Sequence, residues 1–147
     1  MKLTFVLGWA EDFRLRAQTI LFRLRNPSAR MERGVLLKGR LGNLSFGRNV
    51  VIQAFSVIHA GGHRWCNGAG RVVIGDDAII SPHCVIYGAG EGGVRIGRRF
   101  DCGPFVGIYA SRSSFPELGG HEFAPVVIGD DVIVFSHATI SPGVTIG

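Results

Sequence analysis

The stretch Ile128-Gly129-Asp130-Asp131-Val132-Ile133-Val134 decides the fold, because its outline recurs along most of the chain. Ile74-Gly75-Asp76-Asp77 and Ile96-Gly97-Arg98-Arg99 begin in the same way, with a large apolar residue followed by glycine. The apolar anchors of this pattern return every six residues, whereas an ordinary strand alternates every two. The anchors are Phe46, Ile52, Ile58, Ile74, Ile80, Ile86, Ile96, Cys102, Ile108, Ile128, Val134, Ile140 and Ile146. The period predicts short strands joined by tight turns, with every anchor pointing into the core.

Three interruptions of this period follow one rule. They lie between Ile58 and Ile74, Ile86 and Ile96, and Ile108 and Ile128, so three anchors separate each insertion from the next. If three six-residue units make one triangular coil, every insertion leaves the coil at the same corner. We therefore expect the loops 59–71, 87–93 and 109–125 to gather on one edge, and loops on a rigid scaffold often carry function.

Composition agrees with a single folded domain rich in turns. The chain has 147 residues, of which 46% are hydrophobic and 18% charged, and this balance excludes an intrinsically disordered protein. Glycine accounts for 22 residues, about twice the usual share. We expect glycine, Asp and Asn to occupy the turns because turns often need a positive φ.

The N-terminal segment has a different pattern. Residues 9–25 predict a helix, because apolar residues recur there at steps of three or four, and Asn26-Pro27 ends it. The apolar stripe comprises Trp9, Phe13, Ala17, Ile20 and Leu24. We expect this helix to cap the open end of the coils. Residues 1–48 hold ten of the 16 basic residues and three of the 11 acidic ones, so the alternative is a basic helix on an anionic membrane or an acidic partner.

These patterns divide the chain into a basic helix with its connector, residues 1–34, and a β-helix domain, residues 35–147. The chain stops at Gly147, at the start of a new hexad, which is typical of a domain truncated at its C-terminus. No signal peptide and no apolar run long enough to span a membrane is evident, and Cys66, Cys84 and Cys102 are expected to be reduced thiols. We therefore expect a cytoplasmic protein. Nucleic acid is not an expected partner, since the positive charge lies in the N-terminal quarter with no interleaved aromatic platform.

The six-residue period and its I-G-D-D turns resemble the hexapeptide-repeat acyltransferases over roughly residues 35–147. The closest stretch, residues 125–147, is similar to maltose and galactoside O-acetyltransferases and to exopolysaccharide acetyltransferases. The resemblance implies an all-β, left-handed parallel β-helix of about four triangular coils that assembles as a homotrimer. It also implies acetyl-CoA as acyl donor, bound in a groove between neighbouring chains, and a sugar or polysaccharide-precursor hydroxyl as acceptor.

The same resemblance suggests the catalytic residues. Family members carry a general-base histidine in a stretch such as Y-T-A-G-H, and Ser113 occupies that position here. His121, further along the same loop, is then the expected base, because a neutral imidazole can accept a proton from an alcohol near pH 7. Ser113 has no such pKa and is expected only to bind or orient the substrate. His59 and His63 are weaker candidates for the base.

Two further positions match the family. Ser81 stands where galactoside enzymes place a short polar residue near the acceptor, with His83 close by, so both are expected to contact substrate. Ser136 matches a serine near the acyl-CoA thioester, although Phe135 replaces the glycine before it. Cys84 and Cys102 fall at inward positions and are expected to be small core residues.

Two other classes of function remain open from the sequence. The missing motif histidine allows a non-catalytic scaffold or binding module. Val57-Ile58-His59 resembles the first zinc-ligand site of γ-class carbonic anhydrases, which share the repeat. Their other two ligand positions hold Pro82 and Tyr87 here, and His83 lies one residue out of register, which in a strand turns the side chain to the other face. We therefore expect no metal site.

Overall fold

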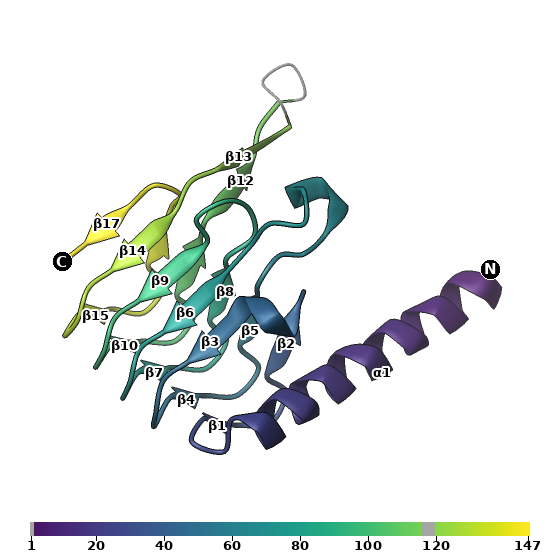
Figure 1. Cartoon of the computed structure of the whole chain (residues 1–147), viewed down its shortest axis with the longest axis horizontal. Helices are drawn as coiled ribbons and strands as arrows, with labels where there is room; N and C mark the ends of the chain where they lie inside the picture. Colours follow the sequence, from purple (N-terminus) through teal and green to yellow (C-terminus); the bar gives the residue numbers. More distant parts are fainter. Residues whose placement is uncertain (1, 116–119) are drawn as a thin grey trace.

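The computed structural model describes residues 2–115 and 120–147, with side chains from Trp9 onward, and is a parallel β-helix preceded by one long helix (Figure 1). Residues 116–119, inside the predicted loop 109–125, lie outside this description. Three five-stranded parallel sheets form the three faces of the coil, so the predicted β-helix is confirmed.

The strands follow one another around the three sheets in strict rotation. Sheet A contains β1 (Arg30–Met31), β4 (Val51–Ile52), β7 (Ile79–Ile80), β10 (Asp101–Cys102) and β15 (Ile133–Val134). Sheet B contains β2 (Leu36–Lys38), β5 (Val57–His59), β8 (Val85–Tyr87), β11 (Gly107–Tyr109) and β16 (Thr139–Ile140). Sheet C contains β3 (Leu44–Phe46), β6 (Val72–Ile74), β9 (Val94–Ile96), β14 (Val126–Ile128) and β17 (Thr145–Ile146). Within the predicted connector, β1 pairs with β4, so the first coil begins at Arg30.

The anchors stack directly on one another through the coils. In sheet A, for example, Ile80 is in register with Ile52 on one side and with Cys102 on the other. All the anchors between Ile52 and Ile140 are buried, and Phe46 and Ile146 pack against the core at its two ends. Cys84 and Cys102 are buried free thiols, as predicted, with Sγ atoms 3.8 Å apart. Burial of this apolar column supplies the main stabilisation of the coil.

The glycine after the sheet C anchors, such as Gly75 after Ile74, serves close packing rather than an unusual backbone conformation. Asp77 and Asp131 have positive φ, as predicted for turns, but Gly75 does not. A Cβ built on Gly75 would lie 2.6 Å from the carbonyl carbon of Gly97 in the next coil. Any other residue would force the two turns apart, so the predicted reason for this glycine is wrong and stacking of adjacent turns replaces it.

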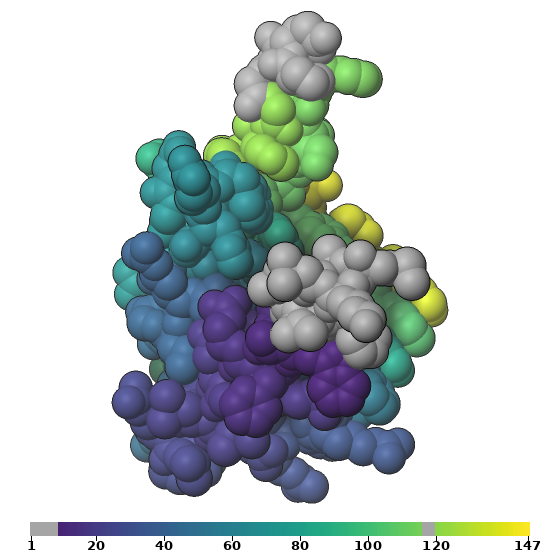
Figure 2. All heavy atoms as spheres, turned by 90° about the vertical axis from the view of Figure 1, so that its right-hand side faces the viewer, coloured from purple at the N-terminus to yellow at the C-terminus, as the bar shows by residue number. Residues whose placement is uncertain are grey.

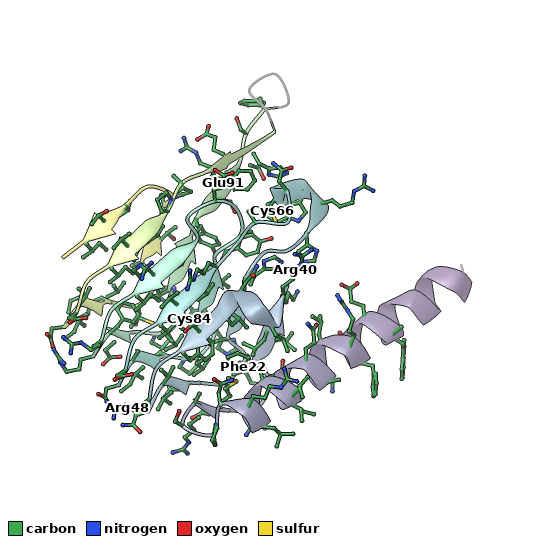
Figure 3. The ribbon with its side chains drawn as sticks, viewed as in Figure 1. Phe22, Arg40, Arg48, Cys66, Cys84 and Glu91 are labelled. Atoms are coloured by element: carbon green, nitrogen blue, oxygen red, sulfur yellow. The ribbon has the colours of Figure 1, made fainter. Side chains whose placement is uncertain are left out.

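The helix α1 (Lys2–Arg25) caps the first coil, but with a different face from the one predicted. Phe22 is 5% exposed, and its ring centroid lies 4.9 Å from that of Phe46. Figure 3 shows Phe22 pointing from α1 into the coils. Thr19 accepts a hydrogen bond from the backbone N–H of Leu37. The predicted stripe instead faces solvent, because Phe13 is 76% exposed and Leu24 is 75% exposed.

One corner is held by ion pairs between successive coils. Arg48 pairs with Asp76 at 3.2 Å and Arg98 with Asp130 at 2.7 Å, in the turns that join sheet C to sheet A. The same carboxylates accept backbone N–H bonds from the arginines they pair with. Among the described residues, no helix is both long and apolar enough to cross a bilayer.

Candidate functional site

The three insertions leave the coil at the single corner between sheets B and C, as predicted from their spacing. They follow β5, β8 and β11, and they contain a 3-10 turn, η2 (Arg64–Cys66), and a hairpin of β12 (Ser111–Ser113) with β13 (His121–Phe123). The loops support one another: Gly70 forms a bridge with Ala89, and the Phe123 ring lies against Gly90. Figure 1 shows them together at one edge of the β-helix.

Aromatic rings line the base of this corner. His59, Tyr87 and Tyr109 end three successive strands of sheet B in register, with ring centroids 4.4 Å and 6.4 Å apart. Trp65 of η2 leans over them, 6.1 Å from Tyr87, and reaches the His121 ring at 5.0 Å. A continuous aromatic surface therefore connects the strands to the hairpin.

These groups enclose an open cavity of about 430 Å³. Its lining consists of Trp65, Tyr87, Tyr109, Ser111, Arg112, Ser113 and His121. The volume lies in the range of small-molecule sites, and so does the combination of aromatic walls with a few polar groups. The predicted base His121 and the predicted substrate-binding Ser113 thus belong to one cavity.

His121 lies directly across the hairpin from Ser113. The two residues are paired in the antiparallel register of β12 and β13, so their side chains are neighbours on one face, with Cβ atoms typically about 5 Å apart. Glu122 cannot orient the His121 imidazole, because its carboxylate is bound to Arg112 at 2.7 Å on the other face of the hairpin. An imidazole at position 121 therefore reaches the space that one at position 113 would occupy.

His59 has a different chemical character. It is 5% exposed, and burial, with the charges of His63 and Lys38 after it, lowers the pKa of His59 to about 4. Its Nδ1 accepts a hydrogen bond from the backbone N–H of Gly61 at 3.2 Å, so the proton of the neutral ring is on Nε2. His59 is therefore a hydrogen-bond donor toward its surroundings rather than a base.

A second cavity of about 350 Å³ connects this corner with the helix. His59, His63 and Tyr87 line one wall, and Glu11, Arg14 and Leu15 of α1 line the other. Figure 2 shows α1 and the insertion loops on the same face of the molecule. The two predicted weaker candidates, His59 and His63, thus lie beside the main cavity and share Tyr87 with it.

The remaining predicted residues lie at another corner. Ser81 and His83 are in the turn from β7 to β8, and Ser136 is in the equivalent turn of the last complete coil, between sheets A and B. His83 belongs to a stack of rings in successive coils, between Phe55 at 5.3 Å and Phe105 at 5.0 Å. A single chain therefore does not bring these residues together with His121, since β8 separates the two corners.

Five residues of the cavity lining were not predicted from the sequence: Trp65, Tyr87, Tyr109, Ser111 and Arg112. A signal for two of them was present, because Tyr87 and Tyr109 directly follow the third anchor of their coils, as His59 does. That position is the last of a strand before each insertion and faces the insertion corner. Trp65 lies within an insertion, where no repeat period indicates which way a side chain points.

No protein-family model matches the chain, and no solved structure matches it. Over residues 2–115 and 120–147, no three His, Cys, Asp or Glu side chains come close enough together to hold a metal ion.

Proposed function

We propose that the protein is an acyl-CoA-dependent O-acyltransferase that transfers an acyl group, expected to be acetyl, to a hydroxyl of a sugar or polysaccharide precursor. The observation that carries this proposal is the cross-strand pairing of His121 with Ser113. Hexapeptide-repeat acyltransferases, which the repeat resembles, hold their base at the position of Ser113. The hairpin gives His121 access to that same space from the opposite strand.

The proposed reaction needs one proton acceptor and no covalent enzyme intermediate. His121 accepts the proton of the acceptor hydroxyl as its oxygen bonds to the thioester carbonyl carbon. The carbon–sulfur bond then breaks, and the imidazolium returns the proton to the departing thiolate. Hydroxyl groups of Ser111 or Ser113 in the cavity are candidates to donate hydrogen bonds to the carbonyl oxygen as it becomes negative.

The lining of the cavity supports a sugar as acceptor. Trp65, Tyr87 and Tyr109 present ring faces, which suit the apolar C–H faces of a pyranose, while Ser111 and Ser113 offer hydroxyl donors to its hydroxyls. A cavity of about 430 Å³ has room for one or two sugar rings. The acceptor is thus proposed to stack on the aromatic surface with one hydroxyl toward His121.

The donor is proposed to bind between chains of a homotrimer. Ser136, its expected contact near the thioester, is exposed on the corner between sheets A and B, away from His121 of its own chain. An arrangement of three chains allows Ser136 of one chain to face the insertion corner of the next. Phe135 beside it is 83% exposed and would form part of the groove wall.

Acyl transfer from acetyl-CoA to a panel of sugars, followed by thiol release, tests the proposal. His121→Ala should lower kcat by roughly 10²–10⁴-fold, the range for loss of a positioned general base, with little change in acetyl-CoA affinity. Phe115→Ala is the matched control, because it alters the same hairpin outside the main cavity and should retain activity. Ser113→His should raise or restore turnover, since it returns an imidazole to the family position.

Full activity in His121→Ala would refute the assignment of the base. Calorimetry that shows no heat with millimolar acetyl-CoA, in protein confirmed to be trimeric, would refute the acyltransferase itself. The aromatic surface favours one other candidate in that case: a sugar-binding module that uses Trp65 and Tyr87 without chemistry. Sugar binding that persists without acetyl-CoA binding would establish this second function.

A further inference from the structure

The outer face of α1 is an apolar surface that the β-helix leaves exposed. We call Trp9, Phe13, Ala17, Ile20 and Leu24 the outer stripe, and all five side chains are exposed. At about 100° per residue they lie within an arc of about 80°, opposite the buried Leu15 and Phe22. The inner face therefore fixes the helix on the first coil while the outer stripe points away. A contiguous apolar surface of this kind on a fixed element marks an interaction site.

Arginines border the outer stripe along both sides. Arg16 and Arg23 lie within about 40° of one edge, Arg14 and Arg25 lie about 60–80° beyond the other, and all four are exposed. The only acidic residues between Trp9 and Arg25 are Glu11 and Asp12, which lie 3.8 Å and 3.9 Å from Arg14 and Arg16. Long basic side chains beside an apolar stripe are typical of helices that lie flat in a membrane interface.

A groove beside the stripe adds to this positive surface. It has a volume of about 560 Å³, lies between α1 and the first coil next to Ile20, and is lined by Arg16, Arg23 and Arg33. Glu32, the acidic residue in the lining, uses its carboxylate to accept a hydrogen bond from the backbone N–H of Ala54. Three guanidinium groups beside an apolar surface complement phosphate headgroups next to acyl chains.

We propose that α1 docks the protein on a bilayer that contains anionic phospholipid. The outer stripe lies at the boundary of the acyl chains, and the bordering arginines contact headgroup phosphates. The charge argues against a second copy of this chain as the occupant, because pairing two stripes would bring like-charged arginine borders together. The proposal does not depend on acyl transfer.

Sedimentation of the full chain with vesicles tests it, using phosphatidylcholine alone and with roughly 30% phosphatidylglycerol. Wild-type protein should bind the anionic vesicles, and binding should fall as salt is raised. Phe13→Ser with Leu24→Ser should weaken binding about tenfold or more, since both side chains lose apolar burial. Arg16→Gln with Arg23→Gln should weaken it about fivefold for each arginine.

Matched variants elsewhere control for folding and for non-specific effects. Phe115→Ser removes a ring that is as exposed as Phe13, and Arg95→Gln removes an exposed arginine of β9, two strands along sheet C from the first coil; both should bind as wild type does. Failure of wild-type protein to bind anionic vesicles at low salt would overturn the proposal. So would equal binding to neutral vesicles, or a change in oligomeric mass caused by the stripe substitutions, which would assign the stripe to a protein contact.

Discussion

His59 illustrates how the coil sets the chemistry of a single residue. It occupies the last position of a strand, where its ring is covered by Tyr87 on one side and approached by His63 on the other. Burial and the neighbouring charges hold its pKa near 4, so the neutral ring is the stable form at any pH above that. Unfolded, the same histidine titrates near 6.5.

This difference predicts a pH dependence of stability. Between pH 6.5 and about 4 the unfolded chain binds a proton at His59 that the folded chain does not, so the free energy of unfolding falls as pH falls. The loss should be on the order of 3 kcal/mol across that window. His59→Gln, which keeps a hydrogen-bond acceptor for Gly61, should flatten this part of the curve in urea unfolding. Parallel curves for wild type and His59→Gln would contradict the assignment.

The helix α1 shows where sequence reasoning succeeded at the scale of an element and where it failed. Its existence and its end at Arg25 were predicted, but its orientation was not. The helix has two apolar faces about half a turn apart, and a period of 3.6 residues fits both. The larger hydrophobic side chains belong to the exposed face, while the packed face includes Thr19, whose hydroxyl bonds to the first coil. Only the shape of the coil end selects between them.

Two phenylalanines on the two faces of α1 test this orientation. Phe22→Ala removes a buried ring and should lower the free energy of unfolding by about 3–4 kcal/mol. Phe13→Ala, on the outer stripe, should change it by less than about 0.5 kcal/mol. Chemical denaturation followed by circular dichroism measures both. The reverse order of the two effects would show that the helix packs with its other face.

At the scale of the whole molecule, the coil and its single insertion corner could be predicted from the six-residue period. Every sixth residue points into the core, so an apolar side chain is needed there in each coil. The candidate cavity followed only in part. Ser113 and His121 could be placed in one loop, but their pairing depends on the hairpin, which has no repeat to reveal it. The separation of Ser136 from His121 likewise becomes visible only when strands are assigned to corners.

Exposed apolar residues on the opposite side of the β-helix support assembly. Ile133 is 67% exposed on sheet A, and Phe105 and Phe135 are exposed on the neighbouring corner. The proposed trimer should give, in light scattering, a mass three times the 15.8 kDa of one chain. Ile133→Ser with Phe135→Ser should reduce that mass, because burial of apolar side chains drives such contacts. A wild-type mass equal to one chain would remove the proposed trimer and, with it, the shared donor groove.

Because every insertion lies at one corner, the cavity can change in evolution without a change in the β-helix that carries it. A loop that grows there leaves the register of the following coil unchanged, since the next strand resumes on the same neighbour. Doubling the length of such a loop costs only about 0.6 kcal/mol of closure entropy. Insertions and exchanges at this corner can thus alter what the cavity accepts while the anchors stay as they are. The corner is the part of the molecule where new specificities can arise by recombination of short segments.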